Sequence, residues 1–149
     1  MAAKKAGAGS AWAAAAARVL LGGVMFYAGF LKLSNVSAFA TDIAHYNLLP
    51  GVLERFLAVV LPWNEVVVGA MLLLGLWTRA AALLVAAMFG MFAVAVITAL
   101  YRGLDINCGC LGHASAGPLG YKTLAFEALG MSLALGVYYF SKAAKARRT

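Results

Sequence analysis

The sequence Cys108-Gly109-Cys110 holds both cysteines of this chain and has the clearest capacity for chemistry. A disulfide requires Cα atoms about 4.4–6.8 Å apart, whereas two residues of extended chain span about 6.6–7.2 Å. Closure therefore requires a bend at Gly109, which glycine permits because it has no Cβ. So small a ring is strained, and strained disulfides exchange readily. A structural disulfide would join distant segments, so this pair is interpreted as a redox or metal-binding device.

His113 extends the pair to the pattern C-x-C-x2-H. Two thiolates and an imidazole are suitable ligands for copper(I) or zinc, so metal binding by Cys108, Cys110 and His113 is an alternative function. A closed zinc site needs a fourth ligand, and His45 is the other histidine of the chain. The simpler interpretation of both histidines is that they are solvated side chains.

Glu65 and Glu127 are acidic residues inside long apolar stretches. At 1.5 Å per helical residue, each lies roughly 13–18 Å from the nearer helix end, close to a bilayer midplane. An ionised carboxylate at that depth is costly, so each should be neutral or paired, with Lys32, Arg18 and Lys122 as candidate cations. We expect Glu65, Glu127 and Lys32 to form either a proton relay or interhelical contacts that fix the bundle.

The sequence Pro62-Trp63-Asn64-Glu65 lies within the second apolar stretch. Pro62 lacks an N–H, so it should kink a helix and free the carbonyl of Ala58. That carbonyl, the Trp63 indole, the Asn64 amide and the Glu65 carboxyl are together a candidate site for the head group of a membrane quinone. The alternative is ordinary: prolines occur in membrane helices, and tryptophan anchors at membrane interfaces.

The composition is that of a membrane protein. Of 149 residues, 64% are hydrophobic and 11% are charged, the net charge is +7, and the mean hydropathy is +0.90. These values exclude a soluble globular enzyme, a disordered tail and a disulfide-rich secreted domain. The pI of about 9.7 does not indicate nucleic-acid binding, because the basic residues adjoin apolar runs, where an anionic bilayer surface is the better partner.

Four apolar stretches are each long enough for a bilayer-crossing helix, which takes about 20 residues. They cover residues 12–33, 53–77, 79–101 and 118–140. The tight link after residue 76 makes the second and third helices antiparallel neighbours. The first link, 34–52, shows helical spacing of apolar residues and is predicted to be a short interfacial helix, whereas the Gly-rich link 102–117 is a loop. The fold class is therefore an all-α, four-helix transmembrane bundle with an interfacial helix in the first exterior loop.

The chain is expected to be one transmembrane domain, residues 11–141, between a basic flexible N-terminal tail, residues 1–10, and a basic cytoplasmic C-terminal tail, residues 142–149. A signal peptide is the competing interpretation of the N-terminus. Arg18 interrupts its apolar run, and no convincing cleavage site follows, so we expect no cleavage.

The distribution of Lys and Arg predicts the orientation. Eight of the twelve lie on one side of the predicted bundle: Lys4, Lys5, Arg18, Arg79, Lys142, Lys145, Arg147 and Arg148. The other side carries Lys32, Arg55, Arg102 and Lys122. Both termini are therefore expected in the cytoplasm, in an inner membrane, with the Cys108-Gly109-Cys110 loop on the exterior or periplasmic side.

Several motifs resemble those of the MauE/DoxX-like redox-associated membrane proteins. They are G-x-x-K-L at 29–33, Y-N-L-L-P at 46–50, L-P-W-N-E at 61–65, Gly69, Gly75, R-G at 102–103 and N-C-G-C-L-G at 107–112. The family usually has C-G-C-F-G, and Leu111 replaces the aromatic residue here, a change that bears on a partner contact. The matching motifs extend over most of the chain.

The resemblance implies a four-helix membrane bundle that acts in thiol–disulfide chemistry or protein maturation at the outer face, beside a thioredoxin-like or other exterior dithiol protein. Our leading hypothesis is a disulfide relay through Cys108 and Cys110, with a membrane quinone as possible cofactor. A non-catalytic small subunit or assembly factor of a larger membrane electron-transfer complex is the alternative that the resemblance also supports. The sequence leaves open the direction of electron flow and which cysteine is attacked first.

Overall fold

The computed structural model describes the backbone of residues 2–104 and 120–146, and the side chains of residues 12–104 and 120–141. Within these ranges the chain forms helices and no strand. The helices are α1 (Ala2–Ser34), α2 (Val36–His45), α3 (Gly51–Leu74), α4 (Thr78–Tyr101) and α5 (Tyr121–Ala146). The all-α fold predicted from the sequence is confirmed.

Four of these helices are long and apolar enough to cross a bilayer. The candidate spans are Trp12–Ser34, Gly51–Leu74, Thr78–Tyr101 and Tyr121–Ser141. In the apolar 18-residue stretch that defines each span, only 22–39% is buried inside the protein. Most of the apolar surface of the spans therefore faces outward, as lipid contact requires. The four-helix membrane bundle is therefore confirmed, and the four spans lie close to the predicted ranges.

The first and last helices extend beyond their spans. Helix α1 begins at Ala2 and so includes residues 2–10, whose sequence shows no periodicity. Helix α5 continues to Ala146. Both extensions are rich in alanine and lysine, which have high intrinsic helix propensity, so they form helix without an amphipathic pattern.

Helix α2 lies in the first long link, as predicted. Asn35 caps its first turn, because the Asn35 side chain accepts a hydrogen bond from the Ala38 N–H at 3.2 Å. The Phe39 side chain is buried against the rest of the protein. The helix ends at His45, and Asn47 then takes a positive φ of 47° in the short connection to α3.

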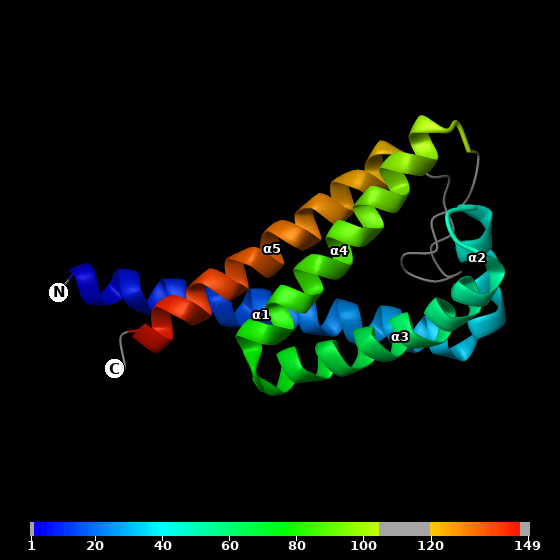
Figure 1. Ribbon diagram of the computed structural model, residues 1–149. Coiled ribbons are helices and arrows are strands. Elements are labelled where there is room, and N and C mark those ends of the chain that lie inside the picture. The colour runs from blue at the N-terminus through cyan, green and yellow to red at the C-terminus, as the bar shows by residue number, and fades with distance from the viewer. Residues whose placement is uncertain (1, 105–119, 147–149) are drawn as a thin grey trace.

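The spans pack as two pairs. Helix α3 packs mainly against α1 and α4 mainly against α5, and the two pairs diverge toward the end where α2 lies, while both termini lie at the opposite end (Figure 1). The sequence predicted α3 and α4 as antiparallel neighbours on the strength of their tight link. They do meet near that link, but each makes its principal contacts with another helix.

The link between α3 and α4 is short because two residues in it adopt left-handed backbone conformations. Gly75 has φ 73° and ends α3 with hydrogen bonds from the Gly75 N–H to Leu72 O and from the Leu76 N–H to Met71 O. Trp77, with φ 42°, then caps α4. This turn reverses the chain without bringing the full lengths of the two helices together.

Glycines on α1 and α3 explain why these two helices pair so closely. A Cβ on Gly29 would lie 2.7 Å from Pro62 O, and a Cβ on Gly69 would lie 2.5 Å from Phe26 N, both too close for any other residue. Small residues allow membrane helices to approach backbone to backbone. The pairing of α1 with α3 is thus a direct consequence of where the glycines lie.

Candidate functional site

A buried ion pair joins the last turn of α1 to the interior of α3. Lys32 Nζ lies 2.5 Å from Glu65 Oε1, and the two side chains are 1% and 2% exposed. The close approach at Gly29, one turn before Lys32, brings the two helices near enough for this contact. The sequence predicted that Glu65 would be paired or neutral, and the structure gives it Lys32 as a partner.

The Lys32 ammonium also lies between two aromatic rings. It is 5.1 Å from the ring centroid of Phe39 on α2 and 5.1 Å from that of Phe92 on α4. A desolvated cation over an aromatic face gains about 2 kcal/mol. Lys32 therefore connects α1, α2, α3 and α4 at one point.

Glu127 on α5 completes this group of charged side chains. It is 1% exposed, and together with Glu65 it lines a small cavity of about 20 Å³ whose other walls are apolar. The second carboxyl oxygen of each residue, Oε2, is buried and has no hydrogen-bond partner. We call Lys32, Glu65 and Glu127 the buried charge cluster. Lys122, the other candidate cation near Glu127, is exposed instead.

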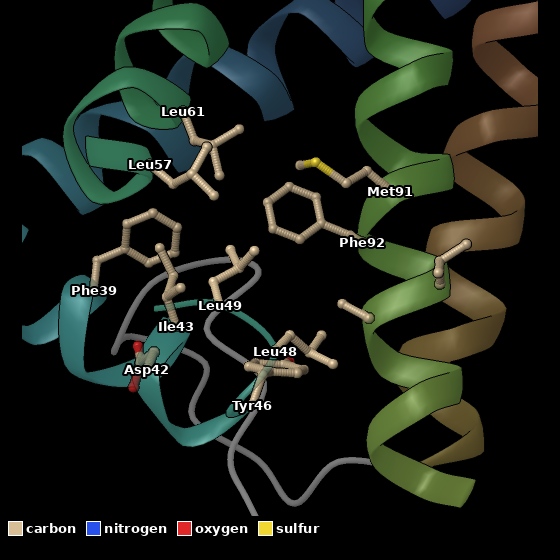
Figure 2. A pocket seen from close by; sticks show the side chains of 12 residues that line it. Phe39, Asp42, Ile43, Tyr46, Leu48, Leu49, Leu57, Leu61, Met91 and Phe92 are labelled. Carbon is tan, nitrogen blue, oxygen red and sulfur yellow. The ribbon is translucent and has the colours of Figure 1, made fainter. Parts of the chain in front are cut away.

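A larger cavity of about 330 Å³ lies between α2, the connection that follows it, α3 and α4 (Figure 2). Figure 2 shows Leu57 and Leu61 facing Phe92 and Met91 across it. We call it the outer cavity, because it lies at the end of the bundle that carries α2. Its full lining is Phe39, Asp42, Ile43, Tyr46, Leu48, Leu49, Leu57, Leu61, Met91, Phe92, Val94 and Ala95.

The outer cavity is apolar and reaches the outer surface of the bundle. Leu48, Met91 and Val94 line it and are also 44%, 44% and 63% exposed, and Met91 and Val94 belong to the candidate membrane span of α4. Its ionisable lining residues are Asp42 and Tyr46. A lipophilic molecule dissolved in the bilayer could therefore enter it sideways, without crossing water.

Tyr46 supplies a hydrogen-bond donor at this cavity. Burial, followed by the negative charges of Glu127 and Asp42, raises the pKa of Tyr46 from 10.0 to about 12. The phenol therefore keeps its proton at any physiological pH. A neutral hydroxyl suits recognition of a carbonyl oxygen.

Arg102, just past the end of α4, ties that end to the rim of the outer cavity. Arg102 Nη1 donates hydrogen bonds to Tyr46 O at 3.0 Å and to Asn47 O at 3.2 Å. The end of α4 and the start of α5, which flank the segment that carries the cysteines, both lie at this end of the bundle (Figure 1). Cys108, Cys110 and His113 themselves lie outside the described residues.

The predicted quinone-binding sequence Pro62-Trp63-Asn64-Glu65 does not converge on one face of α3. Pro62 and Glu65 are buried toward the other helices, whereas Trp63 is 56% exposed and Asn64 is also exposed. Asn64 Nδ2 donates to Val60 O at 3.0 Å, so the amide bonds within its own helix. Adjacent residues on a helix point about 100° apart, which is why these four side chains separate.

Sequence reasoning missed the outer cavity. Its walls come from four segments that are distant in the sequence and consist of leucines, phenylalanines and other apolar residues typical of any membrane helix. The one local signal is Tyr46, which begins the motif Y-N-L-L-P and lines the cavity. Arg102, from the R-G motif, likewise proves to bind this connection.

At the opposite end of the bundle the charged residues have a packing role. A Cβ on Gly75 would lie 2.5 Å from Arg18 Nη1, so the Arg18 guanidinium lies against the end of α3, where carbonyl groups carry partial negative charge. The Arg79 guanidinium lies 5.6 Å from the ring centroid of Tyr138. These two residues lie far along the bundle from the buried charge cluster.

Together these features define a small multi-pass membrane protein with a charged centre and an apolar cavity at one end. The sequence profile of the family described as "Methylamine utilisation protein MauE" matches residues 10–140. The chain therefore belongs to the MauE family.

Three curated relatives carry the name methylamine utilization protein MauE. The Paracoccus denitrificans protein is 29% identical over 127 residues, 82% of this chain and 68% of that protein. The Paracoccus versutus protein is 30% identical over 131 residues, 87% of this chain and 70% of that protein. The Methylophilus methylotrophus protein is 36% identical over 89 residues, 59% of this chain and 47% of that protein. No solved structure is significantly similar to this chain.

Proposed function

We propose that this chain is the inner-membrane component of a thiol–disulfide relay that matures a partner protein on the exterior side. Membership of the MauE family supports a role in methylamine utilisation, because that is the process for which its relatives are named. The observation that carries the proposal is the clustering at one end of the bundle. The end of α4 and the start of α5, between which the chain carries Cys108 and Cys110, lie at the end of the bundle that also carries α2, and α2 contributes to the outer cavity (Figure 1).

The relay reaction balances as a thiol–disulfide exchange. One thiolate of a reduced partner attacks the Cys108–Cys110 disulfide and forms a mixed disulfide with one cysteine of this chain. The second partner thiol then attacks the partner sulfur of that mixed disulfide, closes the partner's disulfide and displaces the cysteine thiolate of this chain. The partner is thereby oxidised, and Cys108 and Cys110 are reduced by two electrons. Restoring their disulfide releases two electrons and two protons, so the chain needs an acceptor that takes up both.

A membrane quinone is the acceptor class that fits the described residues. The outer cavity is apolar, reaches the lipid-facing surface, and is large enough to hold a ring with the start of an apolar tail. The protonated Tyr46 hydroxyl is a donor for a carbonyl of such a ring. When bound there, a quinone would supply the two-electron sink. The residues that line the cavity would position it and exclude water.

The orientation of the chain follows from the distribution of Lys and Arg. Arg18 lies against Gly75 at the end of α3, and Arg79 is in the first turn of α4. The link between α3 and α4 lies toward the end of the bundle where α1 begins and α5 ends (Figure 1). The positive-inside tendency supports a cytoplasmic position for that end. The cysteine-bearing link then faces the oxidising compartment in which a thioredoxin-like or other dithiol partner would meet it.

Trapping the mixed disulfide tests the relay. Cys108→Ser and Cys110→Ser are made separately in the full chain, and cells are quenched with acid before non-reducing electrophoresis. In a single variant the remaining thiol attacks the disulfide of an oxidised partner, which is the reverse of the relay's last exchange step, so one single variant should accumulate a covalent complex with a dithiol protein, which a reductant releases. The control Cys108→Ser/Cys110→Ser should show none. Absence of a complex from both single variants, with full function in the double variant, would favour the non-catalytic subunit.

The metal-binding alternative stays a prediction that the described residues do not address. Among the residues 2–104 and 120–146, no group of three His, Cys, Asp or Glu side chains is arranged to hold a metal ion. Cys108, Cys110 and His113 fall outside that range. Metal analysis of purified protein, compared with His113→Ala, distinguishes this alternative from the relay.

A further inference from the structure

The buried charge cluster has an uneven charge. Lys32 contributes one positive charge, and Glu65 and Glu127 contribute two negative charges if both are ionised. All three side chains are at most 2% exposed. A net negative charge in an apolar interior is strongly unfavourable, and two carboxylates that share a site do not both ionise readily. One added proton makes the cluster neutral.

The geometry provides a place for that proton. Glu65 Oε1 is occupied by Lys32, whereas Glu65 Oε2 and Glu127 Oε2 are buried without partners. Both residues line the same cavity of about 20 Å³. A cavity needs roughly 10–15 Å³ to hold one water molecule, so a single water fits between the two carboxyl groups. A proton on one carboxyl, with this water, satisfies both free oxygens.

No other cation in the described spans reaches the two carboxyl groups. Helix α1 supplies Lys32, and the walls contributed by α4 are Met88, Phe89 and Phe92, which are uncharged. From the α2 side, Tyr46, whose pKa is about 12, is uncharged at neutral pH and interacts with both Glu127 and Asp42. Among the described residues, Lys32 is therefore the one side chain whose positive charge offsets the negative charge of Glu65 and Glu127.

The route for proton exchange leads toward the outer cavity. On the side of the termini the bundle is filled by the packed apolar core, which includes Leu21, Met25, Val68 and Leu72. On the other side, Phe92 lines both the small cavity and the outer cavity. The Phe92 side chain is thus the wall that separates the two spaces.

We propose that Lys32, Glu65 and Glu127 form a binding site for one exchangeable proton and one water, separated from the outer cavity by Phe92. Displacement of the Phe92 ring connects the site to the outer cavity. The protonated carboxyl then gives up its proton to a reduced acceptor bound there and becomes a carboxylate. The site regains a proton from the exterior side.

The delivery step rests on the proposed function, whereas the proton site does not. A quinone that takes up two electrons also takes up two protons to become a quinol. The cluster supplies one of them, and the other comes from the two that the cysteine thiols release. The proton site itself is a property of the resting protein and is tested without partner, quinone or turnover.

Infrared spectroscopy of the full chain in phosphatidylcholine vesicles at neutral pH, without quinone, tests the proton site. The wild type should show the carbonyl stretch of one protonated carboxylic acid. Glu127→Gln and Glu65→Gln should each lose this band, because one carboxylate then balances Lys32. Lys32→Met should increase it about 2-fold, because two carboxyl groups are left without a cation. Glu54→Gln, on the first turn of α3 and outside the cluster, is the matched control and should leave the band unchanged.

Phe92→Ala tests the role of the aromatic wall. It should leave the intensity of the band unchanged and accelerate its shift on transfer to D2O at least 10-fold. A wild type without the band, or a band that survives in both glutamine variants, would overturn the proton site. An exchange rate unaffected by Phe92→Ala would overturn the route. If the carbonyl band is present and no mixed disulfide is trapped, the proton site stands and the relay is rejected. If a mixed disulfide is trapped and the carbonyl band is absent, the relay stands and the proton site is rejected.

Discussion

The stability of the buried charge cluster depends on which of its members is removed. Loss of Lys32 leaves the Glu65 carboxyl buried without a partner, and this carboxyl must then take up a proton. We therefore expect Lys32→Met to lower the free energy of unfolding by about 1–3 kcal/mol. Glu65→Gln should cost less, because Glu127 remains to balance the Lys32 charge. Thermal unfolding of the purified variants in detergent measures the difference.

The exposed Lys122 provides the control for this comparison. Lys122→Met should unfold at the wild-type temperature, because its side chain lies outside the cluster. If Lys32→Met and Glu65→Gln lowered the unfolding temperature equally, this would contradict the claim that Lys32 is the cluster's one cation whereas each carboxyl group can replace the other.

Tyr46 is expected to hold its proton well into the alkaline range. Its pKa is raised from 10.0 to about 12, first by burial and then by Glu127 and Asp42. Because the folded-state pKa lies above the unfolded value, the stability that this proton supports is complete below pH 10.0 and is lost as the pH rises toward about 12. At a pH near the midpoint of that range, Tyr46→Phe should leave the tyrosinate absorbance of the folded protein unchanged.

The denatured chain shows whether the folded environment is responsible. In denatured protein all six tyrosines ionise at ordinary values, so Tyr46→Phe should lower the tyrosinate signal by one tyrosine in six. If Tyr46→Phe lowered the tyrosinate signal of the folded protein by the same amount, this would contradict the raised pKa of Tyr46.

Single residues also mark the limit of what the sequence predicts about the site. Glu65, Glu127 and Lys32 were identified because charges within apolar stretches are costly, and the structure brings all three together. The choice of Lys32 over Arg18 or Lys122 was not predictable, since it depends on the packing of α1 against α3. Trp63 and Asn64 were grouped with Glu65 by adjacency, although adjacent positions on a helix face different neighbours.

At the scale of the helices, the pairing of α1 with α3 depends on glycine. Gly29→Ala would place a Cβ 2.7 Å from Pro62 O, so the helices must separate at the level of the ion pair. We expect a loss of about 1–3 kcal/mol, typical of overpacking, measured by thermal unfolding in detergent. The Lys32–Glu65 contact should weaken with it.

Gly23 on the same helix is the matched control. A Cβ there would meet nothing within 4 Å. Gly23→Ala should therefore be neutral or stabilise the helix by up to about 1 kcal/mol. A Gly29→Ala variant as stable as Gly23→Ala would show that the close approach of α1 and α3 has little energetic weight.

The outer cavity gives a second prediction at this scale. Leu61→Trp fills space between α3 and α4, and it should slow the quinone-dependent reoxidation of Cys108 and Cys110 at least 10-fold. Val59→Trp, on the lipid-facing side of the same helix, should not. Reoxidation rates are followed by thiol labelling after a pulse of reductant. Equal rates in both variants would remove the cavity from the electron pathway.

At the scale of the molecule, the number and ends of the spans were predictable and the arrangement was not. Hydropathy identifies the spans because the bilayer requires about 20 apolar residues per crossing. The tight link between α3 and α4 predicted that these two helices are antiparallel neighbours, yet glycines direct α3 to α1 and leave the two pairs diverging toward α2. The outer cavity follows from that divergence, so the motif Y-N-L-L-P marks one of its residues, Tyr46, without revealing the cavity itself.

The central claim is that Cys108 and Cys110 exchange electrons between an exterior partner and the membrane. The most direct measurement is the thiol state of the wild-type chain in its native membrane. Cells are quenched with acid and labelled with a mass-tagged, membrane-impermeant maleimide, with quinone present and with quinone depleted. The account predicts an oxidised pair that becomes reduced when quinone is depleted and is labelled from the exterior side only. Two thiols that stay free under both conditions would contradict it.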